Sequence, residues 1–532
     1  MIKKKSTLSF SDTNLFSPII LDFIKNDPKL LSFIDCFPSI DSINNKLKQL
    51  NFESRDILVQ TLTKQYKNTS FLNGKAKNVE NNIGLLLDSK TFTVCTGHQL
   101  HIFLSPLFLI YKVTSLIAYS RYLNKNIVGY NCVPCFWMAT EDHDFNEINK
   151  LSINDKTYSW NIDTKNAIGN LSTQSIESML IDMKKALNYT QEGRGLYNIY
   201  YHAYTTNSNY ADATRSILNA LFGDYGLVVV DGNCKELKKL FTQDMKREIT
   251  HNTIFKSIDD TNCTMRTKYK PQINALKSNI FYLYNNTRSK IEYANQKYTS
   301  LVHNKSWSKS EILDEIELYP HRFSPNVFMR TLYQQRVLPN ILYVGGPSEI
   351  AYWLQLSKLF HKTDALYPIL ELRSFFLILS NKVLQFYNKH NLNDTDLFID
   401  HSLKVKKIIQ NMLNFETSDL KDDVNELLQR IEFKINNIDK FPQNSFLVFK
   451  KRVGNALTKL ESKIIKFEKN NHKNLLDQFV SIEKKVFLNN NPQERVYSFI
   501  PYYMKYGSDF FKLLIEESLI FDNKYVILIE KD

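Results

Sequence analysis

Two apolar runs that each end at a cluster of polar residues constrain the fold of this chain more than any other feature. The run TFTVC at residues 91–95 is followed by Thr96, Gly97, His98 and Gln99. The run at residues 132–139 is followed, after Thr140, by Glu141, Asp142, His143 and Asp144. Short apolar and β-branched runs bounded in this way are typical of buried strands. We therefore predict a buried strand before each cluster.

The segment between the two runs is expected to form a helix. We predict that Ser105 caps this helix, that Pro106 takes its first position, and that it extends to about Tyr122. A strand, a helix and a second strand of this size make a βαβ unit, in which the strands are parallel and the crossover is right-handed. Ligands bind beyond the carboxyl ends of the strands in such sheets. Both polar clusters then belong to one candidate site.

Two further strands are expected to end at the same edge. The run at residues 226–230 stops at Asp231 and Gly232. The run at residues 341–344 stops at Gly345, Gly346, Pro347, Ser348 and Glu349. We predict an α/β protein whose parallel-sheet core gathers four strand ends at one site.

The rest of the chain divides into insertions and a helical region. Residues 149–222 and 235–322 are polar and interrupt the alternation, so we interpret them as insertions into the core. The core is then expected to comprise the ranges 1–148, 223–234 and 323–380, and a C-terminal core segment at 476–532 that contains a strand at 524–529.

Residues 381–475 carry two apolar stripes of helical spacing, separated by Phe441 and Pro442. Their members are Leu420, Val424, Leu427, Ile431, Ile435 and Ile438, and then Phe449, Val453, Leu457, Leu460, Ile464 and Phe467. Because proline cannot continue a helix, the stripes predict an antiparallel coiled-coil hairpin. The alternative is a pair of amphipathic helices packed on the core.

Composition limits the classes of partner. The net charge is +13, but the lysines are scattered among acidic residues, so no nucleic-acid partner is expected. No run approaches the ~18 apolar residues of a membrane span. Six cysteines in 532 residues do not make a disulfide framework, which predicts a reducing, cytoplasmic location.

The residues at the strand ends suggest acid–base and anion-binding chemistry. Gly97 allows the backbone to approach a phosphate or carboxylate closely, although His98 could equally be a structural turn residue. We hypothesise that Asp142 or Asp144 receives a substrate ammonium and helps to deprotonate it, with His143 as a relay and Glu141 beside them. The alternative is a solvated acidic loop. Mg²⁺ could bind such oxygens, but the cluster has no specific metal-ligand spacing, and no metal ligand is assigned.

Further binding residues are expected around the glycine-rich strand end. The loop from Gly345 to Glu349 could cradle an anion or a ribose, or it could be a simple strand-to-helix turn. Asn326 and Arg330 could bind a substrate carboxylate, and Tyr352 could either line the site or belong to the core. Asp231 is included because it ends a strand at the same edge.

Two attractive motifs are better explained structurally. Cys132 and Cys135 match a C-x-x-C pattern, but they lie within a predicted strand and not at a helix N-terminus. The segment KSWSKS at 305–310 resembles a synthetase signature loop, yet Ser308 followed by Glu311 forms a helix capping box.

Several longer strings give the chain a family resemblance. They are TGHQL at 96–100, SPLFLIYK at 105–112, VPCFWMATEDHDFNEIN at 133–149, RFSPNVFMRTLYQQRVLPNILYVGGPSEIAYWLQL at 322–356 and QERVYSFIPYYMKYG at 493–507. In content and order they resemble the bacillithiol biosynthesis cysteine-adding family, BshC. Ser105 and Ser348 stand where that family often has glycine, which affects fine geometry only.

The resemblance implies a Rossmann-type core with two connective-peptide insertions, related to class I aminoacyl-tRNA synthetases, and a coiled coil used for homodimerisation. It implies ligation of the carboxyl of L-cysteine to the glucosamine amine of glucosaminyl malate, the last step of bacillithiol synthesis. ATP is the expected cofactor, with bound ADP as an alternative, and His98 resembles the histidine by which those synthetases contact ATP phosphates. Other expectations are a different amino-acid-activating enzyme on the same core, or a nucleotide-binding coiled-coil scaffold without activity.

Overall fold

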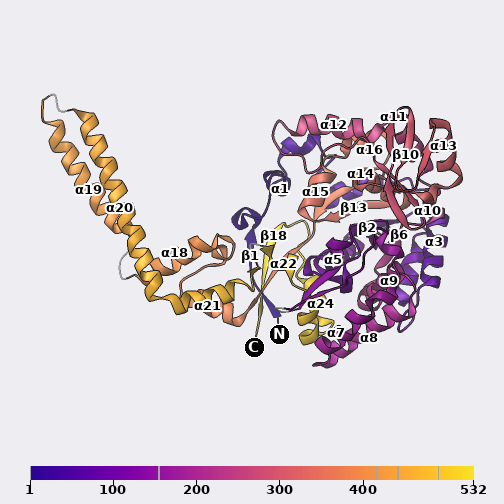
Figure 1. The fold of residues 1–532 in the computed structure, drawn as a ribbon, viewed down its shortest axis with the longest axis horizontal. Coiled ribbons are helices and arrows are strands. Elements are labelled where there is room, and N and C mark those ends of the chain that lie inside the picture. Colours follow the sequence, from indigo (N-terminus) through magenta and orange to yellow (C-terminus); the bar gives the residue numbers. More distant parts are fainter. Residues whose placement is uncertain (1, 154–155, 414–416, 440–441, 489–490, 532) are drawn as a thin grey trace.

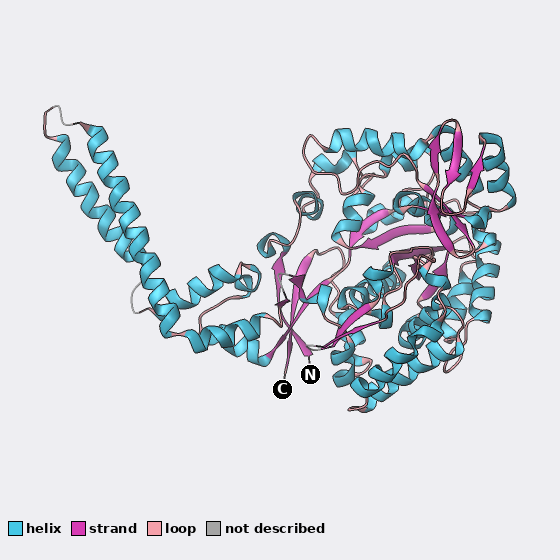
Figure 2. Cartoon of the chain, viewed as in Figure 1, coloured by secondary structure: helices cyan, strands magenta, loops and turns pink. Residues whose placement is uncertain are grey.

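A computed structural model describes residues 2–153, 156–413, 417–439, 442–488 and 491–531 of the chain. Figure 1 shows a body that contains the sheets and a long helical hairpin that projects from it. Figure 2 shows that the two arms of the hairpin are helices, whereas the body mixes strands and helices. No helix in the described part is long and apolar enough to cross a membrane.

The core of the body is a five-stranded sheet whose strands are all parallel, in the order β14-β13-β2-β3-β6. The strands are β2 (Thr91–His98), β3 (Asn131–Met138), β6 (Val228–Asp231), β13 (Asn340–Gly345) and β14 (Ile369–Leu372). Their side chains are almost entirely buried, as expected when both faces of a parallel sheet are covered. The predicted parallel pair and the four strand ends are confirmed.

Helix α5 (Leu107–Asn126) connects β2 to β3 and packs on the sheet. It is buried over most of its length, because α24 (Asp509–Glu516) and α22 (Gln493–Val496) cover its other side. The predicted cap is wrong: the helix begins at Leu107, and Pro106 is its N-cap with extended backbone. The Ser105 hydroxyl therefore cannot reach the first helical amides, and among the described residues it has no hydrogen-bond partner.

Helices also flank the other core strands in the sequence. Helix α15 (Pro347–Trp353) starts directly after β13, with Gly346 as its N-cap. Helix α14 (Val327–Val337) precedes β13, and α16 (Ser357–Lys362) precedes β14. The N-terminal segment adds α1 (Pro18–Ile24), α2 (Ile40–Leu47), α3 (Arg55–Asn68) and α4 (Lys77–Leu85).

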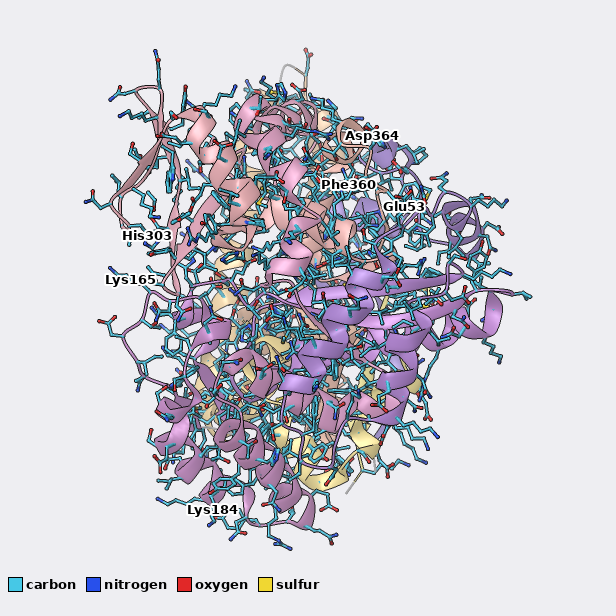
Figure 3. All side chains as sticks on the ribbon, turned by 90° about the vertical axis from the view of Figure 1, so that its right-hand side faces the viewer. Glu53, Lys165, Lys184, His303, Phe360 and Asp364 are labelled. Atoms are coloured by element: carbon cyan, nitrogen blue, oxygen red, sulfur yellow. The ribbon has the colours of Figure 1, made fainter. Side chains whose placement is uncertain are left out.

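The two stretches predicted as insertions form additional structure around the core. The first contains β4 (Lys150–Ile153), β5 (Lys156–Ser159), α7 (Glu177–Leu187), α8 (Gln191–Thr206) and α9 (Tyr210–Phe222). The second contains α10 (Lys235–Lys239), α11 (Thr242–His251), α12 (Thr253–Met265), α13 (Lys309–Leu318) and β7 to β11 within residues 280–307. Figure 3 looks onto the end of the body opposite the hairpin, where Lys165 and Lys184 mark the first stretch and His303 the second.

The two chain ends pair in a second sheet of three strands, β1-β18-β15. Strand β1 (Ile2–Ser9) runs antiparallel to β18 (Lys524–Glu530), with Ile2 opposite Glu530, and β15 (Phe375–Ser380) runs parallel to β18. The predicted terminal strand therefore exists, but it does not join the five-stranded sheet. Figure 1 shows this small sheet between the hairpin and the rest of the body.

The hairpin consists of α19 (Thr417–Asn436) and α20 (Gln443–Asn471). Lys421 contacts Glu461 at 2.7 Å and Lys450 contacts Glu432 at 3.3 Å, so the helices run in opposite directions, as predicted. The helices α18 (His401–Met412) and α21 (Lys473–Glu483) form its base, and α17 (Asn381–Lys389) packs on β15 and β18. Pro442 precedes α20, and Phe441 lies outside the described residues.

Candidate active site

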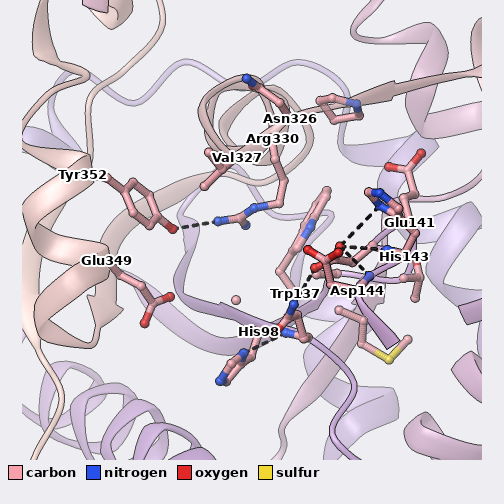
Figure 4. A pocket seen from close by; sticks show the side chains of 18 of the residues that line it. His98, Trp137, Glu141, His143, Asp144, Asn326, Val327, Arg330, Glu349 and Tyr352 are labelled. Carbon is pink, nitrogen blue, oxygen red and sulfur yellow. Dashed lines mark hydrogen bonds and ion pairs between the residues drawn. The ribbon is translucent and has the colours of Figure 1, made fainter. Parts of the chain in front are cut away.

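A cavity of about 480 Å³ lies beyond the carboxyl ends of the core strands (Figure 4). It brings together most of the predicted site residues: Gly97, His98, Gln99, Glu141, Asp142, His143, Asp144, Asn326, Arg330, Gly346, Ser348, Glu349 and Tyr352. Thr96, Asp231, Gly345 and Pro347 are not among the residues that line it. Asp231 instead accepts hydrogen bonds from the Thr140 hydroxyl at 2.5 Å and the Asn233 amide at 2.8 Å, so it fixes the turn behind the cavity.

Gly97 and the guanidinium of Arg330 lie next to each other in the lining of the cavity. A Cβ atom on Gly97 would be 2.9 Å from Nη1 of Arg330, which is too close for an ordinary contact. The guanidinium of Arg330 donates to the Tyr352 hydroxyl at 3.1 Å and to Gln334 at 3.3 Å. Figure 4 shows it pointing toward the centre of the cavity. The glycine thus creates the space for a half-buried cation.

His98 is held as a neutral hydrogen-bond donor. Burial, reinforced by the charges of Lys112, His101, Arg495 and Arg373, holds the pKa of His98 well below its usual 6.5. Its Nδ1 accepts the Gln99 amide at 2.8 Å, so the proton of the neutral ring sits on Nε2. Nε2 is buried and has no partner among the described residues. A polar atom of a ligand in the cavity would satisfy it.

In the acidic cluster after β3, the carboxylate of Asp142 is hydrogen-bonded within the chain, whereas that of Asp144 is exposed. Asp142 accepts the Gln99 side chain at 2.6 Å, the His143 amide at 2.8 Å and the Asp144 amide at 3.4 Å. Its carboxylate therefore organises the loop. Asp144 is exposed at the rim, where it precedes α6 (Phe145–Ile148) without capping it. Of the two aspartates, Asp144 is the one available to a ligand.

His143 contacts a residue of the second inserted stretch. Nη1 of Arg288, on β8 (Thr287–Lys290), lies 3.3 Å from Nδ1 of His143 and 4.0 Å from Asp142. The guanidinium also lies 4.0 Å above the Phe281 ring. Because Arg288 can only donate, Nδ1 of His143 is the acceptor and its Nε2 is free to exchange a proton.

Glu141 is engaged in a structural ion pair. It contacts Nζ of Lys238 at 2.5 Å, and the Lys238 side chain is fully buried and also donates to the Phe323 carbonyl. A carboxylate that neutralises a buried ammonium is not free to bind a substrate cation. This pair anchors α10 to the end of β3.

Glu349 occupies the position at which we predicted an anion cradle. Its carboxylate accepts the Gly346 amide at 2.8 Å and the Tyr343 hydroxyl at 2.8 Å, and it forms an ion pair with Lys112. Burial alone would raise the pKa of this carboxyl, but the Lys112 charge and these hydrogen bonds leave it below 4.5. The start of α15 is therefore already satisfied by the chain itself.

The sequence patterns do not predict four cations that line the cavity: Lys112, Arg288, Arg373 and Arg495. Lys112 lies within a helix that was recognised only by its apolar residues. Arg288 lies in a stretch predicted as an insertion, and Arg495 lies in the C-terminal segment, so neither is near the predicted strand ends in the sequence. Two of the strings that carry the family resemblance, SPLFLIYK at 105–112 and QERVYSFIPYYMKYG at 493–507, contain Lys112 and Arg495 and could have pointed to them.

The two sequence motifs that were assigned structural roles have those roles in the fold. Cys132 and Cys135 are buried within β3 as free thiols, and burial raises the pKa of Cys132 to about 12. Ser308 and Glu311 form the capping box of α13. Within the described ranges, no group of three or more His, Cys, Asp or Glu side chains is placed to hold a metal ion.

The fold and the cavity define an enzyme with a Rossmann-like core, a ligand site at the carboxyl ends of its strands and a helical C-terminal domain. Two family descriptions match the chain: "Bacillithiol biosynthesis BshC, N-terminal Rossmann-like domain" over residues 4–374 and "Bacillithiol biosynthesis BshC, C-terminal coiled-coil domain" over residues 376–530. The chain belongs to the BshC family, and it is an enzyme of the ligase class.

Curated relatives match over nearly their whole length. Proteins named "Putative cysteine ligase BshC" from Flavobacterium psychrophilum and Flavobacterium johnsoniae are 34% and 32% identical, over 94% and 96% of this chain and 95% and 97% of their own. One of that name from Bacillus cytotoxicus is 24% identical, over 96% of this chain and 97% of its own. A solved structure titled as an arginyl tRNA synthetase of Campylobacter jejuni covers 86% of this chain and 97% of its own at 10% identity, but its TM-score of 0.23 supports no argument.

Proposed function

We propose that this enzyme joins the carboxyl of L-cysteine to the glucosamine amine of glucosaminyl malate, the last step of bacillithiol synthesis. The observation that carries the proposal, in a chain of this family, is that one cavity is lined by both carboxylates and guanidinium groups. Asp144 offers an exposed carboxylate, and Arg330 and Arg495 line the same cavity. Glucosaminyl malate has an ammonium at one end and two carboxylates at the other, which suits such a site.

Each step of amide formation has a candidate group in the cavity. Asp144 would receive the ammonium of the glucosamine and take its proton, and His143 would relay that proton to solvent. The Nε2–H of His98 would donate to an oxygen that gains negative charge during the reaction. Asp142 would act indirectly, by holding the loop that carries His143 and Asp144.

We also propose that ATP activates the cysteine carboxyl. Amide formation from a free carboxylate needs an activated acyl group, and transfer of either an adenylyl or a phosphoryl group would supply it. The Nε2–H of His98, which has no partner among the described residues, is a suitable donor to a phosphate oxygen. The reaction would run in the cytoplasm, where ATP is available and where the six cysteines, all free in the described structure, stay reduced.

The test is an incubation of the purified enzyme with glucosaminyl malate, L-cysteine and ATP, followed by mass spectrometry. The expected product is the cysteinyl amide, and release of AMP or of ADP would distinguish adenylation from phosphorylation. Folded protein that forms no amide would contradict the proposal. Replacing L-cysteine by L-serine serves as a control for the identity of the amino acid.

We further propose that the enzyme is a homodimer formed through the hairpin. No residue of the two predicted apolar stripes is fully buried within the chain. Several are largely exposed, including Leu427 at 55% and Phe467 at 64%. Exposed apolar side chains along a projecting hairpin are characteristic of an interface, and a second copy of the same hairpin would cover them.

A further inference from the structure

The cations that line the cavity are not all paired within the chain. Three of the five have a carboxylate partner: Lys112 with Glu349, Arg288 with Asp142 and Arg373 with Glu494. Arg330 and Arg495 have no carboxylate within ion-pair distance in the part of the chain that the structure describes. The charge of Glu349 reaches both guanidinium groups from a longer distance, but neither has a direct ion-pair partner among the described residues, so an anionic ligand can bind them.

Arg495 comes from the C-terminal domain, not from the Rossmann-like core. It lies on α22, which the family comparison assigns to the coiled-coil domain at residues 376–530. Its guanidinium lies 5.1 Å from the centre of the Phe108 ring on α5. This cation–π contact holds the charge of Arg495, a residue of the C-terminal domain, at the cavity of the Rossmann-like core.

The neighbours of Arg495 hold α22 in place. The Gln493 side chain accepts the Ile378 amide at 3.0 Å and donates to the Ile378 carbonyl at 2.8 Å. The side-chain amide thus pairs with β15 in the way that the backbone of a neighbouring strand does. Glu494 pairs with Arg373 at 2.6 Å, and both side chains are almost completely buried. Breaking such a pair is costly, so α22 is a rigid support for the residue that follows.

Arg495 lies on the same side of the cavity as the unpartnered donor of His98. The charges of Arg495, Arg373 and Lys112 all act on that imidazole, which places these groups together. The wall therefore offers planar guanidinium forks and one N–H group, the donors that suit carboxylates. The acidic residues Asp142 and Asp144 line the same cavity and attract an amine.

We propose that Arg495, contributed by the C-terminal domain, binds a carboxylate of the malate moiety together with Arg330, so that both domains build one substrate site. The identity of this ligand rests on the proposed function. The C-terminal domain then has a part in substrate binding, in addition to any part in dimerisation.

The test compares ligand binding to Arg495→Gln, Arg495→Lys and wild-type enzyme by isothermal titration calorimetry, with glucosaminyl malate, L-cysteine and ATP as separate probes. We expect Arg495→Gln to weaken glucosaminyl malate binding roughly 10- to 100-fold, the loss of a charged hydrogen bond, and to leave L-cysteine and ATP binding unchanged. Arg495→Lys should recover part of the affinity because it keeps the charge without the fork.

The matched control is Arg121→Gln. Arg121 also lies over an aromatic ring, that of Tyr225 at 4.8 Å, but it does not line the cavity, so its loss should leave all three affinities unchanged. Circular dichroism of each variant reports whether the fold is kept. Unchanged glucosaminyl malate affinity in folded Arg495→Gln, or a loss confined to ATP, would overturn the inference.

Failure of the two proposals can be told apart. If wild-type enzyme binds glucosaminyl malate through Arg495 but forms no amide, the inference stands and the proposed reaction falls. If the amide forms and Arg495→Gln has the wild-type KM for glucosaminyl malate, the reaction stands and the inference falls.

Discussion

Arg330 occupies the space that a side chain on Gly97 would need, with Nη1 only 2.9 Å from the position of a Cβ atom. The contact joins the end of β2 to α14, two elements that lie more than 200 residues apart in the sequence. Gly97, near the end of β2, is thus required by the close approach of the Arg330 guanidinium.

The first prediction concerns Gly97→Ala. Because the clashing atom is the end of a flexible side chain, we expect Arg330 to move and the fold to be kept. The KM for glucosaminyl malate should rise roughly tenfold, with a smaller change in stability. Steady-state kinetics and thermal unfolding measure the two effects. Gly84→Ala is the control, because nothing lies within 4 Å of a Cβ atom there; an equal rise in KM in that variant would contradict the explanation.

The strand ends were predictable because they follow from local patterns. Apolar runs that stop at polar clusters identified β2, β3, β6 and β13, and the parallel arrangement followed from the helix between the first two. Local patterns could not decide which of Asp142 and Asp144 has a carboxylate free to receive a substrate ammonium. Which carboxylate is engaged depends on the amides of the folded loop and on Gln99, at the end of another strand.

The cations could not be found by pattern alone because single arginines carry no local signal. Arg288 reaches the cavity only because β8 folds back over the end of β3, and Arg495 only because α22 lies against α5. The pairing of β1 with β18 is of the same kind, since it joins residues at the two ends of the chain. Contacts that distant in sequence depend on the complete fold.

The second prediction separates the two aspartates. Asp144→Asn should lower kcat roughly 10²-fold or more, if it removes the group that accepts the ammonium proton, and should leave stability within about 0.5 kcal/mol because the side chain is exposed. Asp142→Asn should instead lower both activity and stability, because its carboxylate accepts three hydrogen bonds.

The control for these variants is Asp163→Asn, which changes an exposed carboxylate that does not line the cavity. Kinetics together with urea unfolding distinguish the roles. Full activity in Asp144→Asn would show that Asp144 is not the base.

The third prediction concerns the ion pair between Glu349 and Lys112. Glu349→Gln leaves the buried ammonium without its counter-charge, so we expect a loss of about 2–3 kcal/mol in the free energy of unfolding, somewhat less than for a fully buried pair because Glu349 is 18% exposed. Glu236→Gln, in an exposed pair with Lys64, should cost less than about 1 kcal/mol. Equal losses in the two variants would contradict the role of burial.

The same pair has a consequence for acid stability. The pKa of Glu349 is lower in the folded chain than its usual 4.5, so the folded state binds this proton more weakly than the unfolded state. The pair's contribution is therefore complete above about pH 4.5 and is lost as the pH falls toward the folded pKa. Urea unfolding between pH 3 and 6 should show a shallower loss of stability in Glu349→Gln than in the wild type.

The fourth prediction concerns Glu371, which is fully buried on β14 and has no cationic partner among the described residues. Burial raises its pKa to about 7, so the folded chain binds this proton more tightly than the unfolded chain. Stability should fall as the pH rises from about 4.5 to 7 and then level off.

Glu371→Gln removes the cost of burying that charge, and its amide oxygen can still accept the Leu372 amide, which donates to Glu371 at 2.9 Å. We expect the variant to be more stable than the wild type by about 1–3 kcal/mol at pH 8, and the two to be similar at pH 5. Denaturant unfolding at both pH values measures the difference. A variant that is less stable at pH 8 would show that the ionised carboxylate is favourably solvated in the fold.

The last prediction tests the hairpin as a dimer interface. Phe433 and Leu447 are 73% and 57% exposed on α19 and α20, near the turn of the hairpin. If a second copy covers them, the double variant Phe433→Ser and Leu447→Ser loses apolar contact area only in the dimer, since neither side chain is buried in the monomer. Light scattering after size exclusion should then show dissociation into monomers, with the monomer fold kept. Val128→Ser, at a lone apolar residue that is 94% exposed, should leave the mass unchanged. A wild-type protein that is monomeric at micromolar concentration would contradict the dimer, whereas the cavity, built within one chain, would remain intact.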